Sequence, residues 1–159
     1  MTELRVDPLT GLKTIIAAAR ADRPGGHFDL EPPPPINVDN DPFALGHEDR
    51  TPPEVYAVRP NGGGPDSPGW TVRVVPNLYP ALAPDAPAPE ANPDLFAAQP
   101  ARGAHEVIVN APQAVSALSD LEPEQLAVAT SSGSSSPSEW TGRGALTITS
   151  WCPAAGIDV

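Results

Sequence analysis

The chain has 159 residues, of which 23 are proline and 40% are apolar, and its net charge is −11. Such a surplus of acids argues against nucleic acid and against an anionic membrane surface as partners, because both attract basic faces. The N-terminus has no apolar run of signal-peptide length, and no stretch approaches the roughly 20 apolar residues of a membrane span. With one cysteine, Cys152, the sequence predicts a soluble, cytoplasmic protein without an internal disulfide.

The first predicted element is a β-hairpin over residues 4–20. Apolar and polar residues alternate on both sides of "DPLTG", whose proline and glycine suit a turn. Residues 24–40 are predicted to be an extended loop, since their prolines remove backbone donors. A short strand is expected at residues 55–58, before the turn-forming sequence "NGGGPDSPG".

The clearest strand pattern is "WTVRVVP". Its alternation predicts Trp70, Val72 and Val74 on one face, with Thr71 and Arg73 on the other. After an Ala/Pro-rich loop over residues 82–103, a second strand follows in "HEVIVNAP". There His105, Val107 and Val109 are expected to share a face.

A helix is predicted to begin at Pro123, which suits a first helical position and is flanked by acids. The helical pattern extends to Thr130, and at Ser131 the composition changes to a Ser/Gly/Pro-rich run. The strands and this helix together predict an α+β fold with an antiparallel sheet. We expect one domain over residues 1–130 and a divergent, disordered or frameshifted tail over residues 131–159.

Five stretches in collinear order resemble galactose-1-phosphate uridylyltransferase, a family of the histidine-triad superfamily. They are "LRVDPLTGLKTIIAAARADRP", "DPFALGHEDRTPPEVY", "GWTVRVVPNLYPAL", "ARGAHEVIVNAP" and "LEPEQLA". The resemblance implies a truncated antiparallel-sheet half-domain, with UDP-hexose and hexose 1-phosphate as partners and a possible homodimer. It also implies uridylyl transfer in galactose metabolism through a covalent histidine intermediate.

The resemblance assigns substrate binding to five positions. Arg20 and Arg23 match arginines that bind the nucleotide sugar across a dimer interface, and guanidinium groups bind phosphate oxygens in a bidentate manner. Asn77 matches an asparagine at the nucleoside, while Phe43 and Arg50 match positions that line the same pocket. From the residues alone, two solvated arginines and a turn asparagine after Pro76 are the alternatives.

The family carries a structural zinc on two cysteines and two histidines. Here Asp41 and Ala44 stand at the cysteine positions, and His105 matches one histidine. Since alanine offers no ligand atom, we expect zinc not to bind, and a hydrogen-bonded core histidine is the alternative role for His105. The neighbouring run of His47, Glu48 and Asp49 could mimic a metal cluster, but a turn with solvated charges is the favoured interpretation.

The family nucleophile lies in a His-x-His-x-Gln motif, which this chain lacks. Its histidines are His27, His47 and His105, and no two are two residues apart. Cys152 has no partner residue in the sequence and is interpreted as an incidental thiol. No catalytic residue is therefore assigned.

Three hypotheses follow for function. The first is an incomplete uridylyltransferase without turnover, arising by frameshift or truncation or as a natural short paralogue. The second is a non-enzymatic module that binds nucleotide sugars or dimerises. The third is an acidic, proline-rich interaction protein without a stable core.

Overall fold

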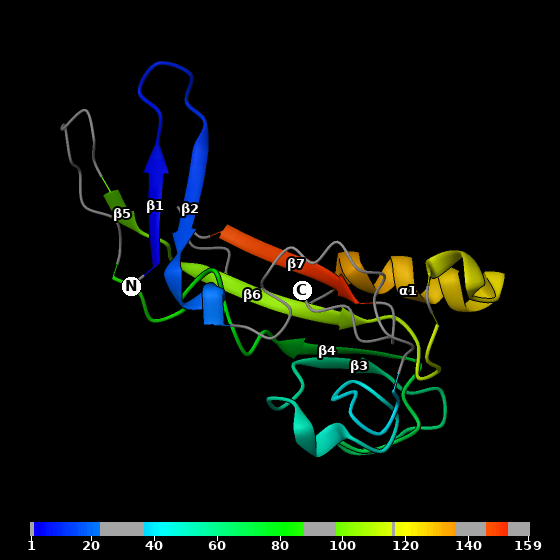
Figure 1. Cartoon of the computed structure of the whole chain (residues 1–159). Helices are drawn as coiled ribbons and strands as arrows, with labels where there is room; N and C mark the ends of the chain where they lie inside the picture. The colour runs from blue at the N-terminus through cyan, green and yellow to red at the C-terminus, as the bar shows by residue number, and fades with distance from the viewer. Residues whose placement is uncertain (1, 23–36, 88–97, 116, 136–145, 153–159) are drawn as a thin grey trace. The chain divides into compact units, whose positions relative to one another are not determined.

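The computed structural model describes residues 2–22, 37–87, 98–115, 117–135 and 146–152 (Figure 1). The chain divides into two compact units. The first unit is built on the N-terminal strands and the segment Tyr79–His105. The second holds most of a four-stranded sheet and the α-helix.

The first unit contains the predicted hairpin. Strand β1 (Thr2–Val6) pairs antiparallel with β2 (Lys13–Ala17), with Thr2 opposite Ala17. The Asp7 carboxylate accepts hydrogen bonds from the backbone N–H of Leu9 (2.9 Å) and from the Thr10 hydroxyl (2.7 Å), and Gly11 supplies a positive φ of 72°. Strand β5 (Ala98–Pro100) adds to the other edge of β1, giving the order β2-β1-β5.

Two segments of the first unit position Arg20 and its partners: the 3-10 helix after the hairpin and the chain from Tyr79 to Ala83. The 3-10 helix η1 (Ala18–Asp22) follows β2 directly and carries Arg20. Ala81 and Leu82 are buried, and Ala83 is held against the chain near β5 by a 2.9 Å bond from its N–H to the Ala101 carbonyl.

The second unit is built on the two strands that the sequence predicted most clearly. Strand β4 (Val72–Pro76) lies between β3 (Tyr56–Val58) and β6 (Gly103–Val109), antiparallel to both. Strand β7 (Leu146–Cys152) follows β6 in the sheet order β3-β4-β6-β7. The predicted antiparallel sheet and helix, an α+β arrangement, are therefore present.

One face of this sheet packs against helix α1 (Pro123–Ser135). Val72, Val74 and Ile108 form a buried cluster there with Ala129 of the helix. The helix begins at Pro123, as predicted, and continues past Thr130 to Ser135. Burial of its apolar side stabilises a helix whose serine- and threonine-rich end has weak propensity of its own. The division of the chain at residue 130 stays a prediction.

The other face of the sheet carries the loop that follows Asp41. Phe43 packs there against Val75 and Val107, and also against Trp70 and Val109. The sequence pattern placed Trp70 on the face of Val72 and Val74, and this is wrong. Regular alternation begins only at Val72, so Trp70 precedes the strand and turns to the face of Val109.

Arg73 is 1% exposed and lies at the centre of a buried ionic network. Its guanidinium donates to Glu54 (3.0 Å) and Asp66 (2.6 Å), to the Thr51 hydroxyl (2.8 Å) and to the Glu48 carbonyl (3.1 Å). Arg59 binds the same Glu54 carboxylate through both terminal nitrogens, at 2.6 and 2.8 Å. The network attaches two loops to the middle of β4. Glu48, Thr51 and Glu54 belong to the loop before β3, and Asp66 belongs to the loop between β3 and β4.

In the described part of the chain, no helix has the length and apolar character that a membrane span requires.

Replacing Glu54 by Gln is expected to lower the free energy of unfolding by about 3 kcal/mol, because two buried guanidinium groups lose their shared counter-charge. Equilibrium urea unfolding, followed by circular dichroism, measures the change. The matched control is Glu3→Gln, which removes an exposed ion pair to Arg5 (side chains 34% and 59% exposed). It should change stability by less than about 0.5 kcal/mol. Equal effects of the two substitutions would contradict the structural role given to Glu54.

Acidification is expected to destabilise the second unit. Burial raises the pKa of Glu54, but bonds from Arg59 and Arg73 outweigh burial and hold that pKa below its ordinary 4.5. Burial also raises the pKa of Asp66, yet the Glu54 backbone N–H and Arg73 bring it below 3.8. Carboxyl groups with a lowered pKa in the folded chain stabilise it above the unfolded pKa, and this stability is lost as pH falls through the folded pKa.

The contribution of Glu54 to the free energy of unfolding should therefore be constant at pH values above 4.5, its ordinary pKa. It should fall progressively as the pH drops below that value. Urea titrations at a series of pH values measure this dependence. The Glu54→Gln variant is the control, and its slope in the acid range should be shallower. An unchanged slope in that variant would contradict the assignment.

Candidate functional site

Arg20 is the candidate phosphate-binding residue that the structure places most clearly. Its Nη1 donates to the Tyr79 carbonyl at 2.9 Å, and the same nitrogen lies 3.5 Å from Nδ1 of His105. All three residues belong to the first unit. A guanidinium has five N–H donors in a fixed plane, so one bond to a carbonyl sets its orientation while other donors stay directed elsewhere.

Arg23, the second arginine of the predicted pair, lies outside the described residues, as does His27. The alternative of two solvated arginines does not describe Arg20, whose guanidinium is anchored to a segment 59 residues away in sequence. Cys152 lies in β7.

The three remaining binding candidates lie in the second unit. Asn77 follows β4 directly and is 9% exposed. Phe43 is packed onto the sheet, so its ring forms part of the floor beneath the loop. Arg50 is exposed and donates to the Asp39 carbonyl at 2.7 Å, which fastens the two ends of the loop. Their roles in substrate binding stay predictions.

The loop from Asp41 to Arg50 is closed by successive tight turns. Ala44, His47 and Arg50 each donate a backbone N–H to the carbonyl three residues earlier, at 2.9 to 3.3 Å. The Asp41 carboxylate accepts from the Phe43 N–H at 2.9 Å, and Nδ1 of His47 lies 2.6 Å from the Asp41 carbonyl. These bonds join the positions where the related family places metal ligands.

Glu48 has a structural role that the sequence interpretation missed. It was expected to be a solvated charge in a turn, but it is buried and accepts from the Trp70 indole at 2.8 Å and from the Gly46 N–H at 3.2 Å. Burial raises the pKa of Glu48, and the bond from Trp70 with further backbone bonds lowers it below the ordinary value. The carboxylate therefore stays ionised and links the loop to the residue that precedes β4. Asp49, in contrast, is exposed as expected.

The donor atoms in this loop do not fit a tetrahedral zinc site. Ala44 is buried and offers no ligand, and one Asp41 oxygen already accepts a backbone bond. The other Asp41 oxygen is buried without a hydrogen-bond partner, so Asp41 offers a single oxygen that could coordinate a metal ion. Across the described ranges, no three His, Cys, Asp or Glu side chains gather as a metal site would require.

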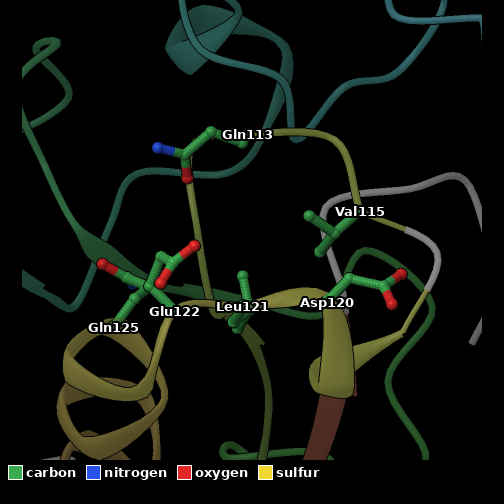
Figure 2. Close-up of a pocket in the computed structure, with 6 residues that line it drawn as sticks. All are labelled: Gln113, Val115, Asp120, Leu121, Glu122 and Gln125. Atoms are coloured by element: carbon green, nitrogen blue, oxygen red, sulfur yellow. The ribbon is translucent and has the colours of Figure 1, made fainter.

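A separate pocket lies at the start of α1 (Figure 2). Its volume is about 230 Å³, and its lining residues are Gln113, Val115, Asp120, Leu121, Glu122 and Gln125. Gln125 also donates to the backbone carbonyls of Thr71 and Asn110, which attaches the helix to the sheet. Two carboxylates in this wall disfavour a phosphate ligand, so the pocket is not the candidate site. No motif in the sequence pointed to it.

Comparison with known proteins places these features in a family. Residues 1–132 match the family model described as galactose-1-phosphate uridyl transferase, N-terminal domain. The chain is also similar to ADP-glucose phosphorylase of Arabidopsis thaliana, with 34% identity over 125 residues, which cover 76% of this chain and 34% of that protein. The chain thus spans about a third of the length of this curated relative.

Two solved structures have similar coverage. A uridylyltransferase structure is 30% identical with a TM-score of 0.48, covering 82% of this chain and 32% of its own. An ADP-glucose phosphorylase from Arabidopsis thaliana with bound ADP-glucose is also 30% identical, with a TM-score of 0.38, covering 79% of this chain and 33% of its own. Because the family model matches most of its length, this chain belongs to the galactose-1-phosphate uridyl transferase family and corresponds to its N-terminal domain.

Proposed function

We propose that this chain recognises a nucleoside diphosphate sugar and that Arg20 binds its phosphates. The anchored Arg20 guanidinium is the observation that carries the proposal. Its orientation is set before any ligand arrives, through the Tyr79 carbonyl, so little side-chain entropy is lost on binding. Nucleotidyltransferase family membership supports the same ligand class, and Arg23 is proposed as the second phosphate contact.

Asn77 is proposed as the contact to the nucleoside. A buried amide next to a strand end can donate and accept at once, as a ribose or a base requires. Phe43 and Arg50 are proposed to hold the Asp41–Arg50 loop in place, since one packs on the sheet and the other bonds to Asp39. UDP-glucose is the ligand implied by the resemblance to uridylyltransferases, while the similar protein of Arabidopsis thaliana is named ADP-glucose phosphorylase. Both nucleotides are therefore candidates.

The chain alone is proposed not to transfer a uridylyl group. It has no pair of histidines two residues apart, and the Nδ1 lone pair of His105 is directed at the Ala81 N–H. Covalent nucleotidyl transfer requires a nucleophile with an available lone pair. We propose a cytoplasmic role in sugar-nucleotide metabolism, of which galactose metabolism is one case, with residues 1–130 as the binding domain.

A second candidate function is a dimerising module. Strand β2 lies at the edge of its sheet, Leu12 directly before it is 68% exposed, and Leu9 in the adjoining turn is 93% exposed. Apolar side chains beside an open strand edge favour association with another chain. A homodimer is the partner that this candidate proposes.

The purified 159-residue chain is expected to bind UDP-glucose or ADP-glucose saturably in isothermal titration calorimetry. Arg20→Ala should weaken binding about tenfold or more, because it removes a charge-assisted bond to phosphate. Arg5→Ala is the matched control, since Arg5 is an exposed arginine of the same unit in a pair with Glu3. It should leave affinity unchanged.

The absence of binding to either nucleotide sugar would overturn the proposal. Uridylyl or adenylyl exchange above the blank rate would overturn the claim that the chain alone is inactive. Sedimentation velocity on the same sample tests the second candidate, and a monomer at all concentrations would contradict it.

The loop is proposed to keep its shape without zinc. Elemental analysis of the purified chain should find no stoichiometric zinc, and chelator should leave the unfolding midpoint unchanged. The Asp41→Cys/Ala44→Cys variant is the positive control, because two thiolates three residues apart raise zinc affinity. Stoichiometric zinc in the natural chain would contradict the proposal.

A further inference from the structure

His105 makes a hydrogen bond that defines its chemical state. The residue lies in the first half of β6 and is 6% exposed. Its Nδ1 is 2.9 Å from the backbone nitrogen of Ala81. A backbone N–H can only donate, so Nδ1 is the unprotonated acceptor and the ring proton is on Nε2.

Ala81, which is hydrogen-bonded to His105, lies two residues after Tyr79, whose carbonyl binds Arg20. The Ala81 N–H donates to the imidazole, and the Tyr79 carbonyl accepts from Nη1 of Arg20 at 2.9 Å. Pro80 lies between them, and its ring fixes φ near −65°. Holding the Ala81 N–H therefore also restricts the direction of the Tyr79 carbonyl.

We propose that His105 is a positioning residue that keeps the Arg20 guanidinium in its phosphate-binding orientation through the Tyr79–Pro80–Ala81 segment. This inference rests on the proposed function of Arg20. His105 itself does not contact the ligand in this scheme. Its Nδ1 organises the segment, and the segment organises the arginine.

The same geometry is unfavourable for a metal ion at Nδ1. The lone pair of this nitrogen is directed at the Ala81 N–H, and metal binding would leave that buried donor unpaired. Nη1 of Arg20 is also 3.5 Å away, so a cation at Nδ1 would lie against a guanidinium charge. A hydrogen-bonding role for this histidine agrees with both observations.

Two substitutions of His105 distinguish the effect of losing the hydrogen-bond acceptor from the effect of losing the imidazole ring. His105→Asn places a side-chain oxygen near the position of Nδ1 and keeps an acceptor. His105→Leu has a comparable size without one. We expect His105→Leu to weaken binding of the nucleotide sugar about tenfold, as a buried donor loses its partner, and His105→Asn to restore most of that loss. In an Arg20→Ala background, His105→Leu should have little further effect on affinity.

Nuclear magnetic resonance tests the same inference without any ligand. Long-range proton–nitrogen spectra of the natural chain should show an unprotonated Nδ1 and a protonated Nε2 for His105. Exchange of the Ala81 amide proton should be slow in the natural chain and in His105→Asn, and fast in His105→Leu. These readouts remain valid if the natural chain binds neither UDP-glucose nor ADP-glucose, a result that would remove the proposed function alone.

Three results would overturn the positioning role. One is a protonated Nδ1 in the natural chain. Another is an equal loss of affinity in both His105 variants with additive effects on Arg20→Ala. The third is unchanged Ala81 exchange in His105→Leu. If His105→Leu does not fold, the nitrogen spectra of the natural chain and the affinity of His105→Asn still decide the question.

Discussion

The buried guanidinium of Arg73 is the interaction on which the second unit depends. A charge removed from water must have all its donors satisfied, and here the acceptors are Glu54, Asp66, Thr51 and the Glu48 carbonyl. These acceptors come from two loops outside the regular strands, which are rich in proline and glycine. The loops therefore take a defined path because Arg73 requires their side chains and carbonyls. Phe43 and Trp70 can then pack on the sheet beside the network.

Local patterns in the sequence predicted those parts of the fold that depend on local chemistry. The alternation around "DPLTG" indicated the hairpin, the valine-rich stretches indicated β4 and β6, and Pro123 indicated the start of the helix. The face of Trp70 was predicted wrongly because alternation holds only within a regular strand. The partners of Arg73 could not be predicted, since Glu54 is 19 residues away and no periodic pattern joins the two positions.

At the candidate site, too, the sequence did not show which groups each side chain contacts. Resemblance to a family pointed to Arg20, Asn77 and His105, because the sequence stretches that contain them match that family. It could not indicate that Nδ1 of His105 faces the Ala81 N–H, or that Glu48 is buried beneath Trp70. The residue type determines which hydrogen bonds a side chain can form. Which of them it does form depends on the backbone groups that the fold brings close to it. The hydrogen bonds inside the Asp41–Arg50 loop are another such case.

The shared carboxylate of Glu54 has a consequence for how this sequence can drift over evolutionary time. Two arginines bind it, and one of them also binds Asp66. Replacing either arginine or Glu54 leaves an unbalanced charge among buried groups, and replacing Asp66, whose side chain is 34% exposed, removes one acidic partner of Arg73. The four positions should therefore change together or remain fixed.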